Sequence, residues 1–109
     1  NKSIEITNGS KISFDFIHVD DAARVIWQVV NSNCTGILNV ASGEEIKLID
    51  LAKKTSLLYQ DDIIIHNVND VNFEENFSNV EILKLKKIMK TFNFIPLENG
   101  LKEIITIWK

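Results

Sequence analysis

The sequence is poor in the residues that mark secreted and nucleic-acid-binding proteins. Cys34 is the only cysteine among 109 residues, so no disulfide can form within the chain and a reducing, cytoplasmic setting is expected. Arg24 is the only arginine and the formal net charge is −3, so there is no basic face to neutralise a nucleic-acid backbone. The sequence therefore excludes nucleic acid as an expected partner.

Long apolar stretches and a signal region are also missing. No apolar run approaches the length that crosses a bilayer, and the first residues alternate like a strand, so no membrane partner is expected. Hydrophobic residues at 45% and charged residues at 25% are ordinary values for a globular protein. The length allows one small domain, and the lack of an initiating methionine at Asn1 suggests a piece cut from a longer chain or a processed short gene product.

Hydrophobic periodicity predicts a small mixed α/β domain with a hairpin, short strands and about four helices. Turn formers at 8–10 interrupt an isoleucine- and phenylalanine-rich run, so a hairpin is predicted over 3–19. Asp20 or Asp21 is expected to cap the helix that continues to residue 30. The later predicted elements are a strand over 37–40, a helix over 48–58, a strand over 63–65, a loop over 67–78, and helices over 80–89 and 97–108.

The sequence contains no pattern that identifies a catalytic or metal site. His18 and His66 are the only histidines, and neither stands at metal-ligand spacing from cysteines or acids. No nucleophile elbow accompanies the serines, and the adjacent pair Asp20 and Asp21 is better explained by helix capping than by acid–base catalysis. We therefore expect no catalytic residue and no metal ligand, and spacing alone identifies only a small α/β domain.

Three segments add a resemblance to a known family. Residues 14–23 read FDFIHVDDAA, residues 36–46 read GILNVASGEEI, and residues 94–101 read FIPLENGL. In this order they resemble the segments R-D-F-I-H-V-D-D-x-A, G-x-Y-N-V-G-S-G-E-E-I and F-x-P-x-x-L-E-E-G-L-K-E of extended short-chain dehydrogenases/reductases. This is the NAD-dependent epimerase/dehydratase family. The resemblance covers nearly the whole chain and implies the C-terminal part of a Rossmann-type extended enzyme.

The resemblance implies NAD or NADP as the cofactor of the parent protein, bound by an N-terminal domain. Members bind it through a glycine-rich turn and use a catalytic tyrosine with a lysine four residues later. Tyr59 is the only tyrosine, and the residue four positions later is Ile63 instead of lysine. The glycine-rich motif does not occur in the sequence either. We therefore expect 1–109 to be a single substrate-side domain fragment that binds no cofactor, lacks its N-terminal cofactor domain and self-associates.

Three positions match the substrate-binding residues of the family. The family's arginine that meets the diphosphate of a nucleotide sugar matches Phe14, and its R-x-G-D loop falls on 69–72, which places Asn69 and Asn72 at the arginine and acid positions. Both arginine anchors are missing, and arginine is the residue that best recognises phosphate through two parallel hydrogen bonds. The asparagines can still bind a ribose or sugar hydroxyl, while a uridine or thymidine diphosphate sugar becomes doubtful.

Three functions stay open at this point. The first is the substrate-binding region of an NAD(P)-dependent nucleotide-sugar epimerase, dehydratase or reductase, which is inactive by itself. The second is a degenerate member of the family that serves as a non-catalytic binding or interaction module. The third keeps the enzyme but replaces the nucleotide sugar with a smaller alcohol or ketone.

Overall fold

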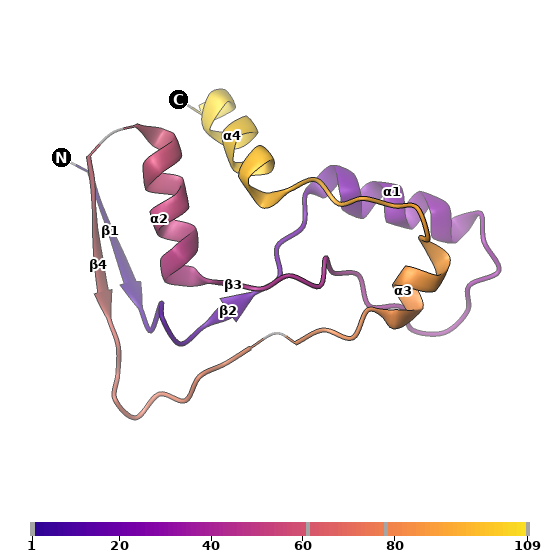
Figure 1. Cartoon of the computed structure of the whole chain (residues 1–109), viewed down its shortest axis with the longest axis horizontal. Coiled ribbons are helices and arrows are strands. Elements are labelled where there is room, and N and C mark those ends of the chain that lie inside the picture. The colour runs from indigo at the N-terminus through magenta and orange to yellow at the C-terminus, as the bar shows by residue number, and fades with distance from the viewer. Residues whose placement is uncertain (1, 61, 78, 109) are drawn as a thin grey trace.

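The computed structural model describes residues 2–60, 62–77 and 79–108. The elements, in chain order, are β1 (Lys2–Thr7), β2 (Ser13–Phe14), α1 (Val19–Val30), β3 (Ile46–Lys47), α2 (Leu48–Tyr59), β4 (Ile63–Val68), α3 (Leu83–Ile88) and α4 (Leu97–Trp108). The molecule is a flat slab, with Cα extents of 51 × 37 × 16 Å. Figure 1 shows β1, β4 and α2 at one end, α1 and α3 at the other, and β2, β3 and α4 between them.

The predicted hairpin over 3–19 is wrong. β1 pairs in parallel with β4, from Lys2 opposite Ile63 to Thr7 opposite Val68, whereas β2 pairs antiparallel with β3. The ladder continues past β1, because the main-chain N–H of Asn8 donates to the Val68 carbonyl at 2.7 Å. An isolated hairpin is marginal in water, while the parallel pair packs under α2.

α2 confirms the helix predicted over 48–58, and it begins without a side-chain cap because Lys47 stands at the N-cap position. Backbone carbonyls replace the cap: the N–H groups of Leu48 and Ile49 donate to Ile12 and Gly9 at 3.0 and 2.9 Å. These bonds satisfy two of the donors that a helix start leaves open. They also fix α2 to the turn between β1 and β2.

A hydrophobic cluster joins α1 to α3. Val25, Leu85 and Met89 are buried at its centre, and the residues packed around them are Val29, Leu38, Ile82, Ile88, Phe92 and Phe94. The predicted aspartate cap of α1 is wrong, because His18 is the N-cap and its side chain accepts from the Asp20 N–H. α3 is shorter than the predicted helix over 80–89.

The predicted strand over 37–40 is absent from the described residues. Side chains rather than a neighbouring strand bind this segment, because Lys84 Nζ donates to the carbonyls of Thr35 and Ile37 at 2.7 and 2.9 Å. The Asn39 side chain donates to the Glu81 carbonyl. Without a partner ladder the segment stays irregular, and 86% of Ile37 is exposed.

In the C-terminal half one predicted boundary shifts and one predicted helix is confirmed. β4 reaches Val68 and so includes the first residues of the predicted loop over 67–78, because all six positions of β1 find a partner. α4 confirms the helix predicted over 97–108, but its apolar side chains are only partly covered: 54% of Ile104 and 83% of Trp108 are exposed. Among the described elements, α4 makes its main contacts with α2.

Candidate functional site

Asp15 binds the turn that follows residue 41. Its Oδ1 accepts from the Ser42 N–H at 3.0 Å and from Ser42 Oγ at 2.7 Å, and its Oδ2 accepts from the Gly43 N–H at 2.8 Å. Gly43 has φ +87°, and a Cβ there would lie 2.6 Å from Ile82 Cδ1, so this position requires glycine. The first two motif segments are thereby joined.

Asp21 joins the first motif segment to the third. It is completely buried, it accepts from the Ile95 N–H at 2.7 Å, and it pairs with Arg24 at 2.5 Å. The Arg24 guanidinium also lies 4.8 Å from the ring centroid of Phe92. A carboxylate with these partners is neither a helix cap nor available for acid–base chemistry, and it holds the segment before α4 against α1.

His18 makes a second link to α4. Its Nδ1 accepts from the Asp20 N–H at 2.9 Å, so the neutral ring carries its proton on Nε2, which lies 3.1 Å from Glu103 Oε2. Gly100 lets the ring approach, since a Cβ there would lie 3.3 Å from His18 Cδ2. Within 2–60, 62–77 and 79–108, no group of histidine, cysteine and acidic side chains is arranged to hold a metal ion.

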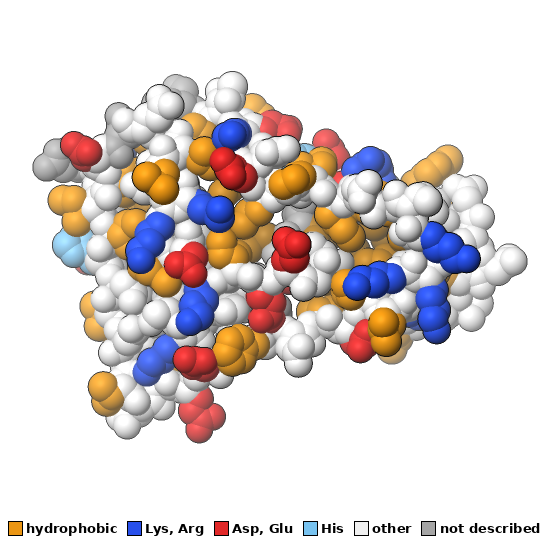
Figure 2. Space-filling view, in the orientation of Figure 1, with side chains coloured by type: hydrophobic (Ala, Val, Ile, Leu, Met, Phe, Trp, Pro, Cys, Tyr) orange, Lys and Arg blue, Asp and Glu red, His pale blue; other side chains and the backbone are white. Residues whose placement is uncertain are grey.

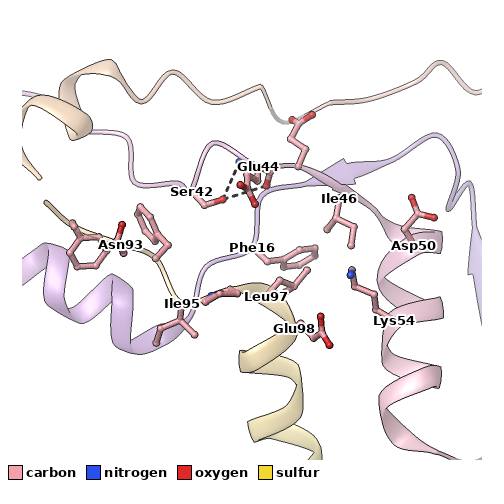
Figure 3. Close-up of a pocket in the computed structure, with 14 residues that line it drawn as sticks. Phe16, Ser42, Glu44, Ile46, Asp50, Lys54, Asn93, Ile95, Leu97 and Glu98 are labelled. Atoms are coloured by element: carbon pink, nitrogen blue, oxygen red, sulfur yellow. Dashed lines mark hydrogen bonds between the residues drawn. The ribbon is translucent and has the colours of Figure 1, made fainter. Parts of the chain in front are cut away.

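An open cavity of about 950 Å³ lies where the three motif segments meet. Figure 3 shows Lys54 of α2 and Glu98 of α4 projecting into the space between these helices, with Phe16 and Ile46 beside them. Its lining residues are Phe16, Ser42, Glu44, Glu45, Ile46, Asp50, Lys54, Phe92, Asn93, Phe94, Ile95, Pro96, Leu97 and Glu98. Half of these residues are apolar or aromatic and half are polar or charged, so the lining is more polar than that of most small-molecule sites.

The cavity carries four carboxylates, Glu44, Glu45, Asp50 and Glu98, against the single cation Lys54 among its described lining residues. Carboxylates accept hydrogen bonds from hydroxyl groups and repel phosphate. The arrangement can therefore bind a hydroxyl-bearing ring more readily than a diphosphate. Sequence reasoning missed these residues, although the spacing of Asp50 and Lys54 is that of neighbours on one helix face.

The structure does not bring the three position-matched residues into this cavity. Phe14 is 44% exposed and its ring centroid lies 5.7 Å from that of Phe16, which does line the cavity. Asn69 donates to Ser10 Oγ at 2.6 Å, and the Asn72 N–H donates to Asp70 at 2.9 Å. The two asparagines thus belong to the loop after β4, beside the turn after β1.

Comparison with known proteins found similarity only at the level of structure. No family model matches the sequence. No curated protein matches it either. RMD from Pseudomonas aeruginosa, complexed with NADPH, superposes with a TM-score of 0.82 at 19% identity over 97% of this chain and 35% of its own.

Two further solved structures are similar over 98% of this chain and 34% of their own. One is the UDP-N-acetylglucosamine 4-epimerase from Methanobrevibacter ruminantium in complex with UDP-N-acetylmuramic acid, with a TM-score of 0.75 at 24% identity. The other is the dTDP-glucose 4,6-dehydratase from Bacillus anthracis in complex with NAD, with a TM-score of 0.80 at 18% identity. The chain therefore spans about a third of the length of these proteins.

These superpositions define the fold class. The chain has the fold of the C-terminal part of extended short-chain dehydrogenases/reductases, the Rossmann-type epimerases and dehydratases, which confirms the resemblance of the three segments at the level of fold. In the part of the chain that the structure describes, every helix is too short or too polar to span a membrane.

Proposed function

We propose that this chain is the substrate-side region of an NAD(P)-dependent enzyme that epimerises, dehydrates or reduces a nucleotide-linked sugar. The observation that carries the proposal is the shared fold: nearly the whole chain superposes on proteins described as a UDP-N-acetylglucosamine 4-epimerase and a dTDP-glucose 4,6-dehydratase. Fold alone permits many functions. The proposal therefore also rests on the cavity and on the three segments that build it.

The chemistry itself belongs to a cofactor domain outside residues 1–109 in this proposal. Tyr59 has no lysine four residues later, and its hydroxyl accepts from Lys2 Nζ at 2.5 Å at the end of α2. The residues of this chain would shape and close the substrate site, while NAD or NADP transfers the hydride from the other domain. The chain alone is then inactive, its partner is the N-terminal domain, and its place is the cytoplasm.

The charges of the site favour the sugar rather than the diphosphate as the group that this chain contacts. Arg24, the only arginine, already forms an ion pair with Asp21 and lies over the Phe92 ring. The cavity offers carboxylates and aromatic rings, which suit the hydroxyl groups and the apolar face of a sugar. Asn69, Asn72 and Ser10, outside this cavity, provide amide and hydroxyl groups for a ribose or sugar.

A specific observation supports the alternative of a non-catalytic binding module. Both arginine positions of the family motif are lost, at Phe14 and Asn69. A glycine-rich turn and a Tyr-x-x-x-Lys pair in the upstream reading frame would exclude this alternative. Their absence would support it. A smaller alcohol or ketone substrate is the third proposal, and density for a nucleotide sugar beside Asn69 and Asn72 would exclude that one.

The proposal is tested by mapping a nucleotide sugar on the folded chain. Backbone amide signals are followed by NMR while UDP-glucose, UDP and glucose are added separately. We expect UDP-glucose to shift the amides around Ser42, Lys54 and Leu97, and UDP alone to leave them in place. Shifts confined to surfaces away from both the cavity and the loop of Asn69 would contradict the proposal.

A further inference from the structure

We propose that Asp15 is a positioning residue whose carboxylate occupies a ring of donors in the Ser42–Gly43 turn and thereby fixes one wall of the cavity. The inference rests on the proposed function in one respect, since it assumes that this cavity receives the substrate. The geometry of the turn stands independently of that assumption.

The turn offers the kind of donor set that binds a free anion. The N–H groups of Ser42 and Gly43 and the Ser42 hydroxyl converge within 3.0 Å on the two Asp15 oxygens. Successive backbone N–H groups in a turn form a concavity that binds anions, and here the anion is a side chain of the same molecule. Hydrogen bonds to a charged acceptor are about twice as strong as neutral ones.

The bonds to Asp15 hold the cavity wall from one end. Ser42 Oγ, while donating to Asp15, accepts from the Glu44 N–H at 3.1 Å, so the carboxylate and the start of the wall share one hydroxyl. Glu44, Glu45 and Ile46 then line the cavity, and Ile46 pairs with Phe14 in the β2–β3 ladder. The wall is thus bonded at Ile46 to β2, and at Ser42 to Asp15, the residue that directly follows β2.

Asp15 also sits between the two walls. Its neighbour Phe16 lines the cavity from the first motif segment, while Glu44 lines it from the second. Figure 3 shows the hydrogen bonds between Ser42 and Glu44 as dashed lines, above Phe16. Loss of the carboxylate would release the turn from the segment after β2 without removing a core side chain, because Asp15 is only half-buried.

A chemical rescue experiment separates positioning by the carboxylate from a general structural role. In Asp15→Ala the donors of Ser42 and Gly43 face a space that a small carboxylate can enter. We expect hydrogen exchange at the Ser42 and Gly43 amides to accelerate about tenfold or more, with the exchange of α2 amides unchanged. Added acetate or formate restores the protection, whereas sodium chloride at the same ionic strength does not.

Two companion variants make the result decisive. Asp62→Ala removes an exposed aspartate outside the cavity, and we expect neither faster exchange at the turn nor a response to acetate. Asp15→Asn keeps the volume but replaces one acceptor oxygen by a donor, so exchange at the turn should accelerate without acetate rescue, because the amide fills the space.

Several results would overturn the proposal. Unchanged exchange in Asp15→Ala means that the carboxylate does not hold the turn. Faster exchange that acetate cannot reverse means that packing, and not the acceptor oxygens, holds it. Global unfolding of both Asp15→Ala and Asp15→Asn would make Asp15 a folding residue. No nucleotide sugar enters this experiment, so its failure is distinguishable from failure of the proposed function.

Discussion

Hydrogen bonds to single side chains link the three motif segments to one another. Asp15 binds the second segment and Asp21 the third, and neither role is visible in the sequence because each partner lies at least 27 positions away. The sequence indicated that Asp21 stands near a helix start, and it placed Asp15 within the predicted hairpin over 3–19. It could not indicate that Asp21 turns inward, because its buried partners are set by packing and not by periodicity.

Removing the buried carboxylate tests this account at the residue scale. Asp21→Ala leaves the Ile95 N–H and the Arg24 guanidinium without their acceptor, so we expect the free energy of unfolding to fall by about 2–4 kcal/mol. Chemical denaturation measures it. The matched variant Asp20→Ala removes a 70% exposed side chain and should change stability by less than about 0.5 kcal/mol. Equal losses in the two variants would contradict the role given to Asp21.

Two glycines with positive φ provide a second comparison. Gly43 has φ +87° and Ile82 Cδ1 lies 2.6 Å from its ideal Cβ, whereas Gly36 has φ +79° with only Lys84 Nζ near, at 3.7 Å. Both alanine variants strain the backbone, by about 1–2 kcal/mol. We expect Gly43→Ala to lower the melting temperature more than Gly36→Ala. An equal decrease in the two variants would show that the Ile82 side chain moves aside at no cost in stability.

At the scale of elements, helices were predictable and strand partners were not. α2 and α4 follow from apolar spacing within twelve residues each. The partner of β1 starts at Ile63, and a two-residue period says which face a side chain takes but not which strand it meets. The cavity was unpredictable for the same reason, since Lys54, Glu98 and Glu44 come together only in the folded chain.

The uncapped start of α2 gives a prediction at this scale. Lys47 has φ −68° and ψ 144°, which is the backbone shape of a good N-cap, yet it forms no side-chain cap. Lys47→Asp should raise the free energy of unfolding by about 0.5–1 kcal/mol, because its carboxylate can accept from the first turn and interacts favourably with the helix dipole. Lys53→Asp, in the middle of α2, serves as the control and should not stabilise the protein.

At the scale of the whole molecule, the surface is unusually apolar for an isolated domain. Figure 2 shows apolar side chains reaching the surface between charged groups of both signs. Among the described residues, Ile37, Trp108 and Trp27 are 86%, 83% and 72% exposed. Such surfaces mark interaction sites. In the proposed function they face the cofactor domain, and the resemblance of three short segments was enough to predict the fold around them.

The exposed apolar surface predicts that the chain by itself self-associates. Sedimentation velocity should show species heavier than the 12.4 kDa monomer at micromolar concentration. Replacing Ile37 and Trp27 by glutamine should shift the distribution toward the monomer, whereas Lys86→Gln on α3 should not. A clean monomer for the unaltered chain would contradict this prediction.

The most direct test of the central claim is isothermal titration of this chain with NAD and NADP. The account predicts no saturable heat with either, because the glycine-rich turn and the Tyr-x-x-x-Lys pair are absent from the sequence. Saturable binding of either nicotinamide cofactor would contradict it, since the chain would then contain a cofactor site of its own.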